Sequence, residues 1–197
     1  MAPLEELRQS LPDYARDIKL NLGSLLGPND LPDLSPAQKW GSAIAAAVAG
    51  RNPVLLSAIE QEAALAIDNA SIEAARFAAA IMAMTNVYYR AVHMARDQEL
   101  SQLPAGLRMN GLTKHGTAPM DFELFGLAAS VVKGCEGCIK AHVEGARKHG
   151  APAQAIQAAI RIAAVIHAAA TVLDAETDLP LMPSVASLAS GSIDATT

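Results

Sequence analysis

Alanine-rich apolar runs constrain the fold of this chain more than any other feature of its sequence. Three of them are SAIAAAVAG (42–50), EAARFAAAIMAM (73–84) and AIQAAIRIAAVIHAAATVL (155–173). Alanine has the highest helix propensity, and its small side chain lets neighbouring helices approach closely. Aromatic residues make up only 4% of the chain, and strand-like runs of β-branched residues are scarce. The sequence therefore predicts an all-α protein.

Proline and glycine residues mark where most of the expected helices begin and end. An amphipathic segment at 4–26 comes first, and Ser35-Pro36 is the N-cap and first-turn signal of a helix that ends at Gly50. Further helices are expected at 53–67, from a cap at Asn69 or Ser71 to 96, and at 119–133, 135–149 and 152–174. The length of 197 residues suits a single domain, 1–175, followed by a flexible tail of small and polar residues, 176–197.

A weak internal repeat is visible at an offset of fifty residues. EAARFAAAIMAMTNVYYRA, from Glu73, aligns with ELFGLAASVVKGCEGCIKA, from Glu123. The shared features are the leading glutamate, an alanine pair, a basic residue and a final alanine. A repeat of this kind would give two related helical halves, of which the half at about 119–175 carries both cysteines.

The formal net charge of −5 argues against general affinity for nucleic acid or for an anionic membrane surface. The segment 155–173 is long enough to span a membrane, but it contains Gln157, Arg161 and His167. We therefore expect a buried helix there, with His167 as a core residue. The first residues carry Glu5 and Glu6 and lack the apolar stretch of a signal peptide, which predicts a cytoplasmic protein in a reducing compartment.

The stretch GCEGCIKAH, 134–142, contains the only two cysteines of the chain. On a helix, Cys135, Cys138 and His142 are spaced i, i+3, i+7 and lie on one face. Gly134 breaks the preceding helix, so Cys135 is expected at a helix N-terminus, where free amide groups stabilise a thiolate. This pattern indicates thiol chemistry.

Two other interpretations of the cysteine pair compete with the dithiol hypothesis. A structural zinc site would need a fourth ligand from His115, His149 or a carboxylate, because the motif supplies only three. The cysteines could also be two small buried residues without a chemical role. The dithiol hypothesis is favoured because a single CxxC is an incomplete zinc pattern, and because a buried cysteine seldom has a histidine one helical turn away.

Glu123 lies in the helix before the cysteines, within the apolar run FELFGLAASVV. One alternative is that its carboxylate faces solvent, as expected of a single glutamate on an amphipathic helix. The other is that it turns towards the next helix and orients His142 as a proton relay, which then takes the proton of Cys138. The residues alone leave both alternatives open.

Glu123, Cys135, Cys138 and His142 together resemble the signature of the alkylhydroperoxidase D (AhpD) family, within the carboxymuconolactone decarboxylase-like superfamily. Eleven residues separate Glu123 from Cys135, two separate the cysteines, and three separate Cys138 from His142. The segments LPDYARDIKLNL, MTNVYYRA, GLRMN and FELF are also similar to AhpD segments, so the resemblance covers about 4–174. It implies an AhpD-like all-α fold and a homotrimer that reduces alkyl hydroperoxides without a bound metal or flavin.

The resemblance also implies a role for each site residue. Cys138 would attack the peroxide, Cys135 would resolve the intermediate by closing a redox disulfide, and Glu123 and His142 would form the proton relay. Electrons would come from dihydrolipoamide on a lipoylated acyltransferase, which dihydrolipoamide dehydrogenase keeps reduced. The peroxiredoxin AhpC is implied as a further partner.

Gly137 departs from the AhpD pattern, because known members have a histidine just before the second cysteine. The missing histidine is expected to affect the pKa of the thiol and the rate of the reaction more than the type of reaction. Two alternative functions remain beside the antioxidant peroxidase: a redox adaptor or disulfide reductase with little direct peroxidase activity, and a zinc-binding structural protein.

Overall fold

The structure, a computed structural model, describes residues 3–27 and 31–177 and confirms the predicted all-α class. Within these residues it contains α-helices and short 3-10 helices, and no β-strand. In chain order they are α1 (Pro3–Ser10), η1 (Asp13–Ala15), α2 (Arg16–Leu26), α3 (Pro36–Gly50), α4 (Pro53–Ala63), α5 (Asn69–Ala95), α6 (Gln98–Gln102), η2 (Asn110–Thr113), α7 (Pro119–Lys133), α8 (Glu136–Lys148) and α9 (Ala153–Thr177).

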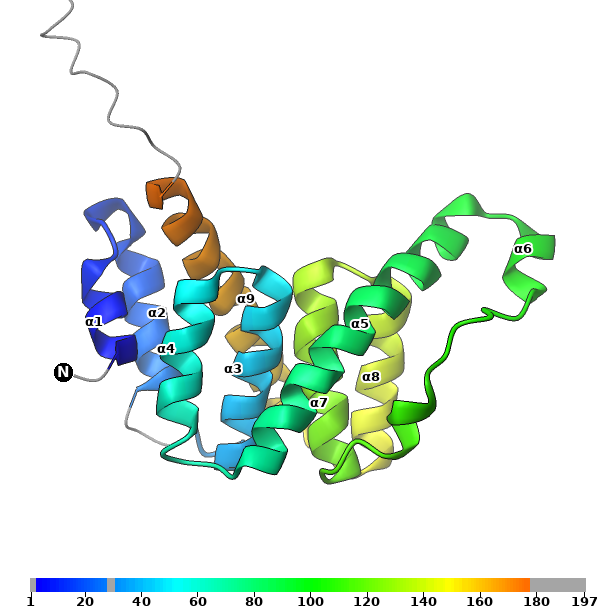
Figure 1. Ribbon diagram of the computed structural model, residues 1–197, viewed down its shortest axis with the longest axis horizontal. Helices are drawn as coiled ribbons and strands as arrows, with labels where there is room; N and C mark the ends of the chain where they lie inside the picture. The colour runs from blue at the N-terminus through cyan, green and yellow to red at the C-terminus, as the bar shows by residue number, and fades with distance from the viewer. Residues whose placement is uncertain (1–2, 28–30, 178–197) are drawn as a thin grey trace, which may run out of the picture.

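Helix α3 is the centre of the fold and packs against α4, α5, α7 and α9 (Figure 1). It begins as predicted: Ser35 accepts a hydrogen bond from the backbone of Gln38, whose side chain bonds back to Ser35. Its alanine-rich sequence is buried on nearly every side. The absence of a side chain at Gly41 lets the ring of Phe125 on α7 approach the α3 backbone directly.

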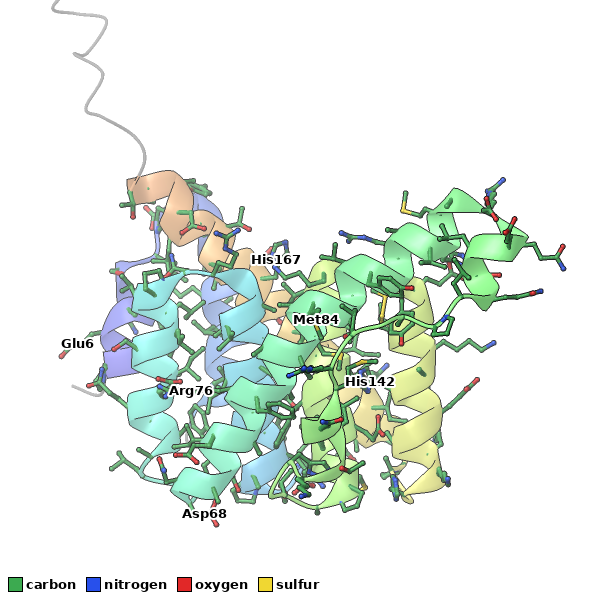
Figure 2. The ribbon with its side chains drawn as sticks, turned by 45° about the vertical axis from the view of Figure 1, so that its right-hand side comes forward. Glu6, Asp68, Arg76, Met84, His142 and His167 are labelled. Carbon is green, nitrogen blue, oxygen red and sulfur yellow. A yellow bond between two sulfur atoms is a disulfide. The ribbon has the colours of Figure 1, made fainter. Side chains whose placement is uncertain are left out.

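Helix α9 lies beside α3, α7 and α2. By length and composition alone it could cross a membrane, the one helix in the described part of the chain for which this holds. Ile162 and Ile166 are nevertheless fully buried against the other helices, as expected of a core helix. The prediction that His167 is a core residue was wrong, because His167 lies on the exposed face of α9 (Figure 2).

Several predicted helix boundaries were wrong. The expected segment at 4–26 is divided at Pro12, which has no amide hydrogen to continue α1, and the chain turns through η1 into α2. The expected helix at 53–67 ends at Ala63. The cap of α5 is Asp68, not Asn69 or Ser71; its carboxylate accepts from the Ser71 backbone at 2.8 Å, and the hydrogen bonds from Ser71 lower the pKa of Asp68.

The end of α9 extends beyond the predicted Asp174. Glu176 belongs to the helix and accepts a hydrogen bond from the hydroxyl of Tyr14 at 2.7 Å, which raises the pKa of that hydroxyl. The predicted tail at 176–197 therefore starts too early by two residues, and from 178 onwards it lies outside the described residues.

The two segments of the possible repeat differ in backbone structure. Helix α5 runs without a break through Met84, which aligns with Gly134. In the second segment Gly134 adopts a left-handed conformation, with φ at 64°, and separates α7 from α8. The turn that carries the cysteines is therefore a feature of the second segment alone.

An arm extends from the helical body on the side opposite α1 and α2, and consists of the end of α5, α6 and the chain to about 118 (Figure 1). It presents large apolar side chains to solvent: Met94 is 70% exposed and Leu103 57%. Such a group of exposed apolar side chains on one extension is a feature of interaction surfaces.

The close approach of α3 and α7 gives a stability prediction. A Cβ atom at position 41 would lie 2.1 Å from the Phe125 ring, which is completely buried and cannot move aside. We expect Gly41→Ala to lower the free energy of unfolding by about 1–3 kcal/mol through overpacking. Gly50→Ala, at the end of the same helix, meets only Ala170 at 3.5 Å and serves as the control. Thermal or denaturant unfolding tests this, and equal stability of the two variants would contradict it.

Candidate active site

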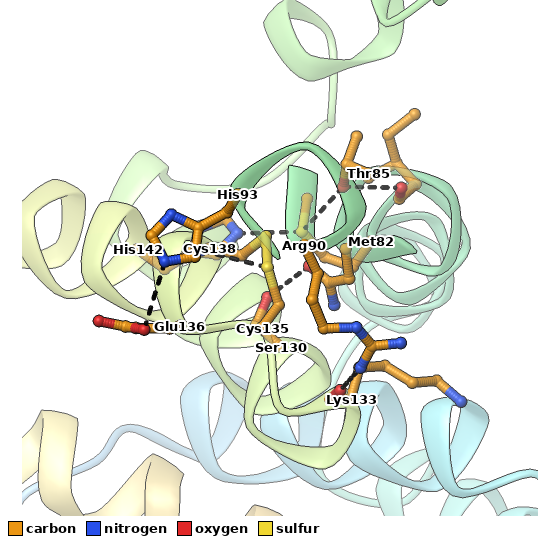
Figure 3. Close-up of a disulfide and its surroundings, with 12 residues drawn as sticks. Met82, Thr85, Arg90, His93, Ser130, Lys133, Cys135, Glu136, Cys138 and His142 are labelled. Atoms are coloured by element: carbon orange, nitrogen blue, oxygen red, sulfur yellow. Dashed lines mark hydrogen bonds and ion pairs between the residues drawn. A yellow bond between two sulfur atoms is a disulfide. The ribbon is translucent and has the colours of Figure 1, made fainter. Parts of the chain in front are cut away.

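Cys135 and Cys138 form a disulfide at the start of α8 (Figure 3). Cys135 precedes the helix as its N-cap, so the predicted start at 135 was one residue early; its sulfur accepts from the Cys138 backbone amide at 3.4 Å. Cys138 lies in the first turn. Cys135 is 1% exposed and Cys138 8% exposed, so Cys138 is the more exposed of the two residues.

The turn between α7 and α8 is held from two sides. The amide of Cys135 donates to the Ser130 carbonyl at 3.2 Å, which closes the turn around Gly134. From α5, Arg90 donates to the carbonyl of Lys133 at the end of α7, and Asn86 accepts from the Ser130 hydroxyl at 3.1 Å. A cationic side chain at a helix C-terminus is also favoured by the helix dipole. Sequence reasoning did not assign Arg90 or Asn86 to this position.

Glu123 and His142 meet across the interface of α7 and α8. The Nδ1 atom of His142 lies 2.7 Å from Oε2 of Glu123. The side chains are partly shielded, with 26% of Glu123 and 13% of His142 exposed. Of the two alternatives for Glu123, the structure therefore has the one in which its carboxylate turns towards the next helix and orients the imidazole.

The other ring nitrogen of His142 contacts Met82 on α5. The distance from Nε2 to the Met82 sulfur is 3.0 Å (Figure 3). In the described part of the chain, no hydrogen bond joins His142 to either sulfur of the disulfide. Which ring nitrogen donates and which accepts in these two contacts depends on the tautomer of the imidazole. Sequence reasoning treated Met82 as part of an apolar helix and missed this contact.

The described part of the chain does not bring together the side chains that the zinc alternative would need as ligands. Among residues 3–27 and 31–177, no group of three or more His, Cys, Asp or Glu side chains is arranged to hold a metal ion. His115, one candidate for the fourth ligand, instead stacks on the ring of Phe122 at 4.2 Å. The two sulfur atoms are bonded to each other.

Comparison with known proteins gives matches over most of the chain. Residues 98–177 match the model of the carboxymuconolactone decarboxylase family. A relative from Rhodospirillum centenum, named alkyl hydroperoxide reductase AhpD, is 51% identical over 89% of this chain and 93% of its own length. Proteins of the same name from Anaeromyxobacter dehalogenans and Acidobacterium capsulatum are 48% and 43% identical, each over 88% of this chain and over 92% and 94% of their own lengths.

The matches include the part of the chain in which the four candidate residues lie. The region of the family model runs from α6 to the end of α9 and includes Glu123, both cysteines and His142. The similarity to the AhpD proteins covers nearly the whole length of each relative. The chain therefore belongs to the AhpD family, as the resemblance in its sequence predicted.

Proposed function

We propose that this protein is an alkyl hydroperoxide reductase that acts as an antioxidant dithiol peroxidase. The observation that carries the proposal is the Cys135–Cys138 disulfide beside a carboxylate–imidazole pair, in a chain whose relatives are named for this activity. A disulfide between two cysteines that are separated by two residues at a helix start is the oxidised form of a dithiol that can pass two electrons to a substrate.

Cys138 is proposed as the thiolate that attacks the peroxide. It is the more exposed of the two cysteines, and it lies in the first turn of α8, where amide groups favour negative charge. Once the disulfide is reduced, Nε2 of His142 leaves its contact with the Met82 sulfur, approaches the Cys138 thiol and accepts the proton of that thiol. Nδ1 remains bound to Glu123, which stabilises the resulting imidazolium.

The attack forms a bond between the Cys138 sulfur and the terminal oxygen of the hydroperoxide while the O–O bond breaks. The alkoxide that leaves takes the proton from His142 and becomes an alcohol, and Cys138 becomes a sulfenic acid. The Cys135 thiol then attacks the Cys138 sulfur. A disulfide forms and the hydroxyl group leaves as water, with the proton of Cys135.

Reduction of the disulfide completes the cycle. We propose dihydrolipoamide, carried by a lipoylated acyltransferase, as the donor of two electrons and two protons. Its dithiol is oxidised to a cyclic disulfide, which dihydrolipoamide dehydrogenase reduces again. No bound cofactor is required in this scheme. The peroxiredoxin AhpC is proposed as a second acceptor of electrons from the reduced pair, and the cytoplasm as the compartment, because its reducing conditions sustain the dithiol.

We also propose that the protein assembles as a homotrimer. The support from this chain is the arm at the end of α5 and α6, whose exposed Met94 and Leu103 remain unpacked in a single copy, together with the exposed Val87 earlier on α5. Burial of apolar side chains of this size against a second copy is favourable. Light scattering on the purified protein measures the assembly directly.

One prediction of the proposed function concerns the attacking cysteine. Cys138→Ser removes the nucleophile, so we expect turnover of a small organic hydroperoxide to fall by roughly a thousandfold or more. The measurement is a coupled assay with lipoamide and lipoamide dehydrogenase, and thermal unfolding verifies that the variant is folded. Substantial activity in the folded variant would contradict the assignment of Cys138.

The same assay separates the peroxidase from the redox-adaptor alternative. If oxidised AhpC is reduced rapidly while free hydroperoxide is consumed only slowly, the protein transfers electrons between two partners and its direct peroxidase activity is incidental. Rapid consumption of the free hydroperoxide supports the peroxidase.

Another prediction of the proposed function concerns the proton relay. Glu123→Gln and His142→Ala remove the groups that draw the proton from the thiol, so the pKa of Cys138 should rise and its alkylation near neutral pH should slow by about tenfold or more. Alkylation of the reduced protein across a range of pH measures both quantities. Lys140→Met, which removes an exposed charge from the same helix, is the control. Unchanged profiles in the two relay variants would exclude the relay.

A further inference from the structure

Two glycines face the Glu123–His142 pair, one from each helix. A Cβ atom built on Gly126 of α7 would lie 2.5 Å from Cε1, 2.7 Å from Nε2 and 2.9 Å from Nδ1 of the His142 ring. A Cβ atom built on Gly145 of α8 would lie 2.5 Å from Cδ and within 2.7 Å of both carboxylate oxygens of Glu123. Each relay side chain therefore occupies the space that a side chain on the opposite helix would need.

The arrangement is reciprocal. Glu123 and Gly126 are three residues apart on α7, and His142 and Gly145 are three residues apart on α8, so each pair lies on one face of its helix. The glycine of each helix receives the relay side chain of the other. Two backbones without side chains at these points bring the imidazole and the carboxylate to 2.7 Å from each other.

A glycine in the interior of a helix makes the helix less stable than an alanine would at the same position. The packing around Gly126 and Gly145 explains why glycine occurs there. Gly137, also in α8, has no atom within 4 Å of a built Cβ, so contact with a neighbouring side chain is not common to every glycine of this helix. The contacts at Gly126 and Gly145 involve the two residues of the relay.

We propose that Gly126 and Gly145 are positioning residues that fix the orientation of His142 and Glu123 towards each other. The proposal rests on the proposed role of the pair as a proton relay. An alanine at either position displaces the opposing side chain rather than the helix, because the atoms in the way are the ends of side chains. With 13% of His142 and 26% of Glu123 exposed, both can turn out towards solvent.

This differs from the contact at Gly41, where the opposing Phe125 ring is completely buried and has no free space to enter. We therefore expect Gly126→Ala and Gly145→Ala to remain folded, with thermal midpoints close to that of the wild type, while the reactivity of the thiol changes. If the two glycines had a purely structural role, the alanine variants would have lower thermal midpoints and an unchanged thiol reactivity.

The experiment measures the pH dependence of Cys138 alkylation in the reduced, full-length protein. We expect Gly126→Ala to slow alkylation near neutral pH by about tenfold or more, as we expect of His142→Ala, and Gly145→Ala to have the effect expected of Glu123→Gln. Gly50→Ala, a remote helix position with only an ordinary contact, is the matched control and should leave the profile unchanged.

Double variants make the test specific. In His142→Ala the ring is absent, so adding Gly126→Ala should cause no further loss of reactivity. Adding Gly145→Ala to Glu123→Gln should likewise cause no further loss of reactivity if Glu123 acts through its negative charge, which the amide of Gln lacks. Losses that multiply in both double variants would show that the glycines act independently of the relay and would overturn the proposal.

NMR of the His142 ring gives a readout that does not depend on the relay hypothesis. Displacement by Gly126→Ala or loss of the Glu123 contact in Gly145→Ala should shift the ring nitrogen resonances, while Gly50→Ala should not. Unshifted resonances in both glycine variants would overturn the positioning role. If the resonances shift but His142→Ala itself leaves alkylation unchanged, the positioning stands and the relay of the proposed function fails.

Discussion

The contact between Glu123 and His142 is the interaction on which the candidate site depends. It joins α7 to α8 at 2.7 Å, and His142 lies four residues, about one helical turn, after Cys138 on α8. Since the two helices are separated by a single left-handed glycine and the N-cap Cys135, their relative position also decides where the disulfide lies. The same contact thus organises local structure and supplies the groups for proton transfer.

The rest of the fold supports this pair of helices. Helix α3 holds α7 from one side through the close contact of Gly41 with Phe125, and α5 holds the turn through Arg90 and brings Met82 to the imidazole. Alanine-rich sequences make such proximity possible, because small side chains allow helices to pack at short distances. The composition of the chain is therefore connected to the geometry of its site.

The sequence was most informative where local rules decide the structure. Proline and glycine determine the starts of α3 and α7 and the break at Gly134, and regular helical spacing placed both cysteines and His142 on one face. The direction of Glu123 could not be decided in this way. Whether a side chain on an amphipathic helix faces solvent or a neighbour depends on how the helices pack, which the spacing within one helix does not contain.

The same reason explains what the sequence did not predict. In α9, alanines occur on every face, so the apolar pattern did not reveal that His167 lies on the outer side. Met82 reaches the imidazole from a distant part of the chain, sixty residues away, and no local pattern announces that contact. The space above Gly126 and Gly145 that the relay side chains occupy forms only when α7 and α8 pack together. The sequence did contain one signal of it, because a glycine follows both Glu123 and His142 by three residues.

In the proposed mechanism, the thiolate of Cys138 reduces the peroxide after the Glu123–His142 pair has taken its proton. The most direct test treats the reduced Cys135→Ser protein with one equivalent of an alkyl hydroperoxide and traps sulfenic acid with a selective reagent before mass spectrometry. We expect a trapped adduct on Cys138 in this protein, and none on Cys135 when Cys138→Ser is treated in the same way. An adduct on Cys135 in the Cys138→Ser protein, with Cys138 left unmodified in the Cys135→Ser protein, would contradict this mechanism.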